Sequence, residues 1–173
     1  APSTKIAFII NTDVDWVTKT PPDGTPQIWL TTNGSITATE LAGDMLVGHI
    51  HSTEDDVTLY AGGRIVDADT DDGATVTVDV SAVNITLVSG ANVGETPQTA
   101  GGIGASDDFL EINVDRNDGT PAGLLYAYDN NAAAPTHDGI YIDEMKGNLT
   151  VALVHSLENV SLRTVDGSIL DGE

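Results

Sequence analysis

The sequence predicts an all-β fold, a parallel β-solenoid (β-helix) of short stacked strands, on three observations. Apolar and polar residues alternate with a period of two in runs such as 76–80, 110–114 and 149–153, as in a strand with one buried face. No segment shows the 3.6-residue periodicity and caps of a three-turn amphipathic helix. The third observation is an internal repeat, which favours the solenoid over the alternative, a β-sandwich.

The repeat aligns residues 36–69 with residues 140–173 at an offset of 104 positions, which slips by one where 57–59 meets 160–162. The identity of Glu40 with Glu144 and of Gly43 with Gly147 keeps the two segments in register. Layers of a solenoid contact mainly their neighbours, so such an array can be cut at many points. We therefore expect residues 1–173 to form a single solenoid segment taken from a longer array.

The expected strands share this alternation and are separated by turn residues. In chain order they lie at 6–11, 28–30, 57–59, 76–80, 85–87, 110–114, 124–126, 149–153 and 160–162. Glycine-containing turn signals stand between them at 33–34, 42–44, 62–63, 72–73 and 166–167. With only two Phe and two Trp, the core must be aliphatic, which suits thin, regularly layered sheets.

The charge is one-sided, with 27 acidic against 6 basic residues and a formal net charge of −21. Nucleic-acid binding is therefore not expected, because phosphate contact requires clustered Lys and Arg. The acidity agrees with a solvated surface, a salty habitat or divalent cations that neutralise carboxylates. The chain has no cysteine and no apolar run long enough for a membrane span.

Two stretches resemble a known class of proteins. The run 102–112 and the run 147–151, followed by 160–162 and 167–171, are similar to phrases of filamentous-haemagglutinin-type adhesins and other giant bacterial β-strand-repeat proteins. The resemblance covers most of residues 28–173. It implies a right-handed parallel β-helix, an extracellular or bacterial cell-surface location, a role as stalk, fibre or adhesin, and no catalytic residues.

An acidic stretch predicts a calcium site with Asp67, Asp69, Asp71 and Asp79 as ligands. Residues 67–73 begin like a D-x-D-x-D-G calcium loop, in which oxygen ligands alternate before a glycine turn. Gly73 falls one place late, and Val78 stands where a bidentate Glu is usual. A solvated acidic turn therefore remains the alternative to structural calcium.

Two functions from different classes follow, and neither makes the chain an enzyme. The first is a structural segment that self-associates through its solenoid ends, with calcium promoting association. The second is an adhesin module that binds a surface glycan or protein through insertions at 18–26 and 129–138. Its candidate contact residues are Trp16, Trp29 and Tyr128. A polysaccharide-degrading β-helix enzyme is a distant third, because the six basic residues are scattered.

Overall fold

The computed structural model describes residues 6–10, 27–41, 43–69, 77–91, 100–114, 123–130 and 136–173, and for 6–10 and 136–138 it describes the backbone alone. All regular structure in these ranges is β-strand, which confirms the predicted all-β class. Within the same ranges, no helix is long and apolar enough to cross a membrane.

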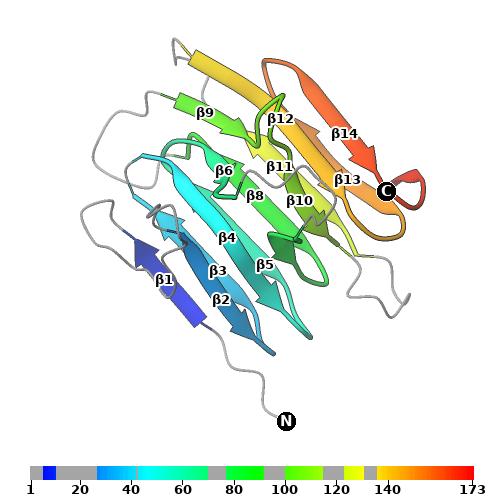
Figure 1. The fold of residues 1–173 in the computed structure, drawn as a ribbon, viewed down its shortest axis with the longest axis horizontal. Helices are drawn as coiled ribbons and strands as arrows, with labels where there is room; N and C mark the ends of the chain where they lie inside the picture. Colours follow the sequence, from blue (N-terminus) through cyan, green and yellow to red (C-terminus); the bar gives the residue numbers. More distant parts are fainter. Residues whose placement is uncertain are drawn as a thin grey trace.

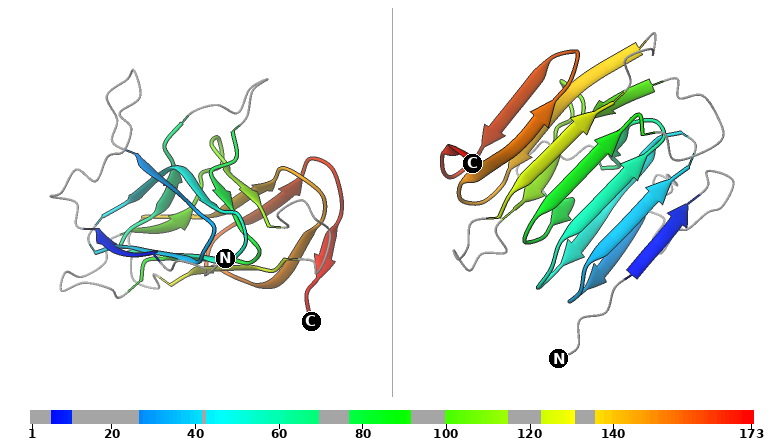
Figure 2. Two further views of the ribbon diagram at one scale, coloured as in Figure 1. Left: turned by 90° about the horizontal axis from the view of Figure 1, so that it is seen from below. Right: turned by 180° about the vertical axis from the view of Figure 1, so that it is seen from behind.

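The strands form two parallel sheets that lie face to face (Figures 1 and 2). The seven-stranded sheet contains, in order, β1 (Ile6–Ile10), β3 (Ile36–Glu40), β5 (Val57–Ala61), β8 (Ile85–Ser89), β11 (Leu125–Asp129), β13 (Leu149–His155) and β15 (Ile169–Asp171). The eight-stranded sheet contains, in order, β10 (Leu110–Asn113), β7 (Val80–Ser81), β4 (Met45–Ser52), β6 (Ile65–Asp67), β9 (Ala100–Ile103), β12 (Thr136–Glu144) and β14 (Val160–Thr164), and β2 (Ile28–Thr32) pairs with β4.

The chain crosses between the sheets after most strands, so neighbours in a sheet follow each other along the chain. Seen from behind (Figure 2, right), the seven-stranded sheet runs from β1 to β13 in sequence order. In the eight-stranded sheet, two of the stacked layers each consist of two short strands placed end to end. Strands β6 and β7 pair with the two halves of β4, and β9 and β10 pair with the two halves of β12. The chain thus leaves the sheet after Asp67 and re-enters it at Val80, in the middle of one layer.

The inward side chains of both sheets form one aliphatic core. On β3, β5 and β8 buried and half-buried positions alternate strictly, as expected for strands with one face in the core. Leu59 and Leu87 from the seven-stranded sheet and Ile50, Ile65 and Ile103 from the other have no exposed surface. Because every second side chain of these strands points into this core, every second residue of the sequence is apolar.

The aligned segments pair in the same register but in opposite sheets. Ile36 lies opposite Val57 where β3 pairs with β5, and Ile140 lies opposite Val160 where β12 pairs with β14. The first pair of strands belongs to the seven-stranded sheet and the second to the eight-stranded sheet. The two copies of the repeat therefore begin in different sheets: the first copy begins on β3 of the seven-stranded sheet and the second on β12 of the eight-stranded sheet.

One expected strand is much shorter than predicted. The run 76–80 alternates well, but in its described part, from residue 77 on, the ladder pairs begin only at Val80 and continue to Ser81, as β7. Strand β6 already occupies the first half of β4, so the returning chain pairs only with its second half, where Ile50 lies opposite Val80. The prediction of a strand is therefore wrong for residues 77–79, while residue 76 lies outside the described residues.

Candidate functional site

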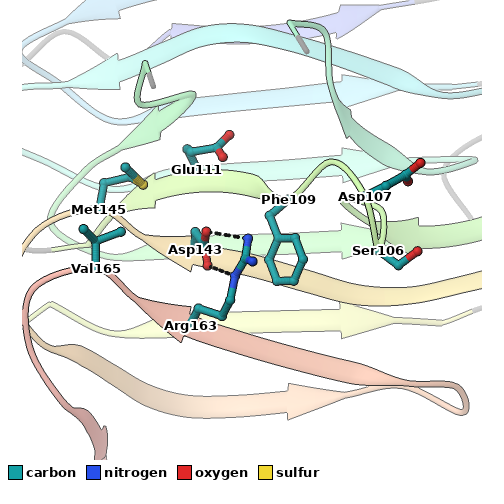
Figure 3. A pocket seen from close by; sticks show the side chains of 8 residues that line it. All are labelled: Ser106, Asp107, Phe109, Glu111, Asp143, Met145, Arg163 and Val165. Atoms are coloured by element: carbon teal, nitrogen blue, oxygen red, sulfur yellow. Dashed lines mark hydrogen bonds and ion pairs between the residues drawn. The ribbon is translucent and has the colours of Figure 1, made fainter. Parts of the chain in front are cut away.

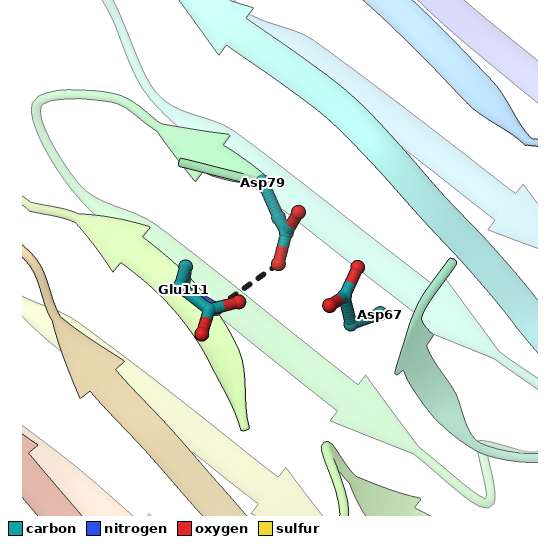
Figure 4. Close-up of side chains that lie close together, drawn as sticks. All are labelled: Asp67, Asp79 and Glu111. Carbon is teal, nitrogen blue, oxygen red and sulfur yellow. Dashed lines mark hydrogen bonds between the residues drawn. The ribbon is translucent and has the colours of Figure 1, made fainter. Parts of the chain in front are cut away.

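Three buried carboxylates meet where the chain leaves and re-enters the eight-stranded sheet. Asp67 ends β6, Asp79 precedes β7, and Glu111 lies on the neighbouring strand β10 (Figure 4). One carboxylate oxygen from each lies within 4.8 Å of the others. Asp79 and Glu111 are each 1% exposed and Asp67 is 8% exposed. We call this group the acidic cluster.

Burial and repulsion from the neighbouring carboxylates raise the pKa of Asp79. Burial, followed by the charge of Asp67, raises the pKa of Asp79 from 3.8 to about 10, and the Glu111 carboxylate adds to the rise. The Glu111 backbone N–H donates to Asp79 Oδ2 at 3.0 Å, which opposes the rise without outweighing it. Without a neutralising charge, Asp79 therefore holds a proton at neutral pH.

The donor set of the acidic cluster suits a hard divalent cation. Calcium takes six to eight oxygen ligands, and carboxylates bind it through one or two oxygens each. The three carboxylates supply three to six of these, so Asp67, Asp79 and Glu111 could hold one calcium ion. A cation there would favour the ionised form of Asp79 by the same electrostatics that now favour its proton.

The structure brings two of the four predicted calcium ligands together. Asp67 and Asp79 belong to the acidic cluster, whereas Asp71 lies outside the described residues. Asp69 is not part of the acidic cluster, and its Oδ1 accepts a hydrogen bond from Gln27 Nε2 at 2.7 Å. Sequence reasoning missed Glu111, which reaches the cluster from a different strand and so falls outside any loop motif.

A shallow groove of about 330 Å³ lies on the outer face beside the acidic cluster and includes Glu111 in its wall (Figure 3). Arg163 crosses it, with Nε donating to Asp143 Oδ1 at 2.6 Å and a second nitrogen donating to Oδ2 at 2.7 Å. The guanidinium also lies 3.3 Å above the centre of the Phe109 ring. The positive charge is thus engaged on both sides, which argues against an anion-binding role for Arg163.

The predicted contact residue Trp29 lies on β2 and contacts Gln27, just before that strand, and His49 on β4. Its Nε1 donates to Gln27 Oε1 at 2.9 Å, and its ring centre lies 5.4 Å from that of His49. A Cβ added at Gly48 would lie 2.3 Å from Trp29 Nε1, so the indole closes directly over this glycine. Trp16 lies outside the described residues, as does the insertion 18–26.

Tyr128 lies on the outer face of the seven-stranded sheet, next to an open groove. Its ring stacks on His155 with 4.6 Å between ring centres and a 13° angle between planes. The groove, about 340 Å³, is lined by Thr86, Leu87, Val88, Tyr126, Tyr128 and Leu153. The nearby insertion is shorter than expected, because Asp129 still belongs to β11 and residues 136–138 already belong to β12.

Comparison of the chain with protein-family models, with curated proteins and with solved structures gave no match.

Proposed function

We propose that the chain is a non-catalytic structural repeat segment of a large bacterial cell-surface protein, folded as a right-handed parallel β-solenoid. One observation carries the proposal: the chain passes back and forth between two parallel sheets, and each sheet is built up layer by layer along the chain, with β6 and β7 sharing one layer and β9 and β10 sharing the next. Such a stack extends in one direction and suits a stalk or fibre, because each layer contacts mainly the layers before and after it.

The pairing geometry supports a solenoid over a sandwich. Every pairing between named strands is parallel, and the one antiparallel contact among the described residues is an isolated bridge between Ala105 and Asp108. Sandwiches are built mainly from antiparallel hairpins and Greek keys. Parallel strands joined through an opposite sheet are what a solenoid requires.

The proposed surface location and the proposed lack of catalysis rest on observations other than the strand pairing. The location rests on the resemblance to giant adhesins and on the net charge of −21. The non-catalytic role is supported by the burial of Asp67 and Asp79, since carboxylates that cleave glycosides must flank an accessible sugar.

Assembly of the purified chain tests this function. We expect light scattering and electron microscopy to show growth into rods when millimolar calcium replaces a chelator, because divalent cations screen and bridge carboxylates. Sodium chloride at the same ionic strength serves as the control for screening alone. A chain that stays monomeric at high concentration in every condition would overturn the assembly role.

A second candidate function is glycan binding by an adhesin module, and the groove beside Tyr126 and Tyr128 favours it. Tyr126 is 37% exposed, and aromatic rings stack on the apolar faces of sugars. We expect a screen of neutral oligosaccharides to find a ligand whose binding is lost in Tyr126→Ala and Tyr128→Ala but kept in Thr37→Ala, on the same face away from the groove. Assembly into rods should be unchanged in all three variants, and binding that survives both tyrosine changes would exclude this groove.

A further inference from the structure

Two histidines stand side by side on the outer face of the eight-stranded sheet. His49 and His51 are two positions apart on β4, so their side chains leave the same face of the strand. Ile50 and Ser52, which alternate with them, are fully buried, whereas both histidines are half-buried. The two ring centres lie 5.7 Å apart, with a 77° angle between the ring planes. We call these two residues the histidine pair.

The strand that carries the histidine pair is held on both sides. Along one edge β4 pairs with β2, where Trp29 lies opposite His49 and Thr31 lies opposite His51. Along the other edge it pairs with β6 and β7, and Ser81 of β7 lies opposite His51. The Trp29 ring, whose centre lies 5.4 Å from that of His49, packs against that imidazole. The two rings are therefore presented from a fixed backbone, as a preorganised binding site requires.

A hydrogen bond fixes the position of the proton on the His49 ring. His49 Nδ1 lies 3.1 Å from the carbonyl oxygen of Val78. A carbonyl oxygen only accepts hydrogen bonds, so Nδ1 carries the hydrogen and the neutral ring keeps its lone pair on Nε2. Histidines that bind metals usually donate their other ring N–H to a carboxylate or a backbone carbonyl in this way. His49 therefore presents Nε2 as a metal ligand.

His51 can supply the second ligand nitrogen. Within the part of the chain that the structure describes, its ring makes no hydrogen bond, so it can turn about its side-chain bonds without breaking one. Burial, followed by the charge of His49, lowers the pKa of His51. The His51 ring is therefore neutral at neutral pH and has a lone pair available for a cation.

The spacing of the two rings suits one shared ion of the zinc type. A zinc–nitrogen bond of about 2.1 Å and a tetrahedral angle place the centres of two bound imidazole rings about 5 Å apart. The observed 5.7 Å between the ring centres reaches this separation by a small rotation of the His51 side chain. Calcium and magnesium prefer oxygen ligands, whereas imidazole suits zinc, copper and nickel. The histidine pair thus selects a different class of cation from the acidic cluster.

We propose that His49 and His51 bind one zinc ion through their Nε2 atoms, with water in the remaining coordination positions. The net charge of −21 raises the concentration of divalent cations near the chain. The site is distinct from the acidic cluster, although Val78, whose carbonyl orients His49, directly precedes Asp79. Zinc binding at this pair does not require assembly of the chain, so it goes beyond the proposed structural role.

Isothermal titration calorimetry with zinc chloride tests this site. The chain is titrated at neutral pH in millimolar calcium, which occupies any hard-ion site first. We expect His51→Ala to weaken zinc binding by about tenfold or more, because losing even the hydrogen-bond partner of a metal ligand costs about 10- to 100-fold in affinity. His155→Ala is the matched control: His155 is exposed and stacks on Tyr128 in the other sheet, so its loss should leave the zinc affinity unchanged. Melting temperatures in a chelator show that both variants are folded.

Nuclear magnetic resonance of the imidazole rings provides a readout that a packing role would not move. Zinc should shift the Hε1 resonances of two of the four histidines, and these should be the resonances that His49→Ala and His51→Ala remove. The site is overturned if the original chain binds no zinc, or binds it no more tightly than His51→Ala. Zinc binding that is lost in Asp79→Asn but kept in His51→Ala would also overturn it, because the ion would then lie in the acidic cluster.

Discussion

Replacement of Leu87 by alanine is expected to lower the free energy of unfolding by about 2–5 kcal/mol. Leu87 has no exposed surface and lies in the middle of the seven-stranded sheet, opposite Leu59 on one side and Ala127 on the other. Strands on both sides hold the backbone, so the cavity cannot collapse easily. Urea denaturation followed by circular dichroism measures the change.

Thr86→Ala is the matched control for Leu87→Ala. Thr86 is the adjacent residue on β8 and is half-buried on the outer face, so its truncation should change the free energy of unfolding by less than about 0.5 kcal/mol. Equal effects of the two substitutions would contradict the assignment of inward and outward faces, and with it the core between the two sheets.

Replacement of Asp79 by asparagine is expected to have opposite effects with and without calcium. In a chelator at neutral pH the variant should be more stable than the original chain by about 1–3 kcal/mol, because a neutral amide removes the free-energy cost of protonating Asp79, whose pKa in the folded chain is raised to about 10. The amide oxygen of the introduced side chain can still accept the hydrogen bond that Glu111 N–H donates to Asp79. The melting temperature in a chelator provides the first half of this test.

Calcium provides the second half. A ligand at a hundred times its dissociation constant stabilises the folded state by about 2.7 kcal/mol. If the acidic cluster binds the ion, the original chain should gain this stabilisation and Asp79→Asn should not. Asp143→Asn is the control, because Asp143 is a carboxylate on the outer face outside the cluster. A melting temperature of the original chain that calcium leaves unchanged would exclude the cation, and Asp79 would then be stabilised by its proton alone.

The sequence was sufficient to predict the strand class but not every strand. Alternating runs such as 57–59 and 85–87 became β5 and β8, because burial on one face leaves a direct mark on residue type. Strand β9 has the sequence AGGI, which carries no such mark. It forms because Ile103 stacks between Ile65 and Ile140, so its position is set by neighbours that are distant in sequence.

The acidic cluster shows the same limit for a site. Asp67 and Asp79 could be selected because they flank one acidic segment, and a loop motif draws attention to both. Glu111 sits in an alternating run in which a polar residue is expected at every second position, so nothing local distinguishes it from a solvent-facing residue. It becomes a candidate ligand only when β10 pairs with β7 and its side chain is buried beside Asp79.

The direction of the hydrogen bonds has a mechanical consequence. In both sheets these bonds point along the stacking axis, so a pull between the two ends would load successive strand pairs in series. The layer that contains β6 and β7 is interrupted, and β7 contributes only two opposed residues to each neighbour. At that level β5 and β8 are opposed at four positions without a break, so the seven-stranded sheet would bear most of the tension where its partner is weakest.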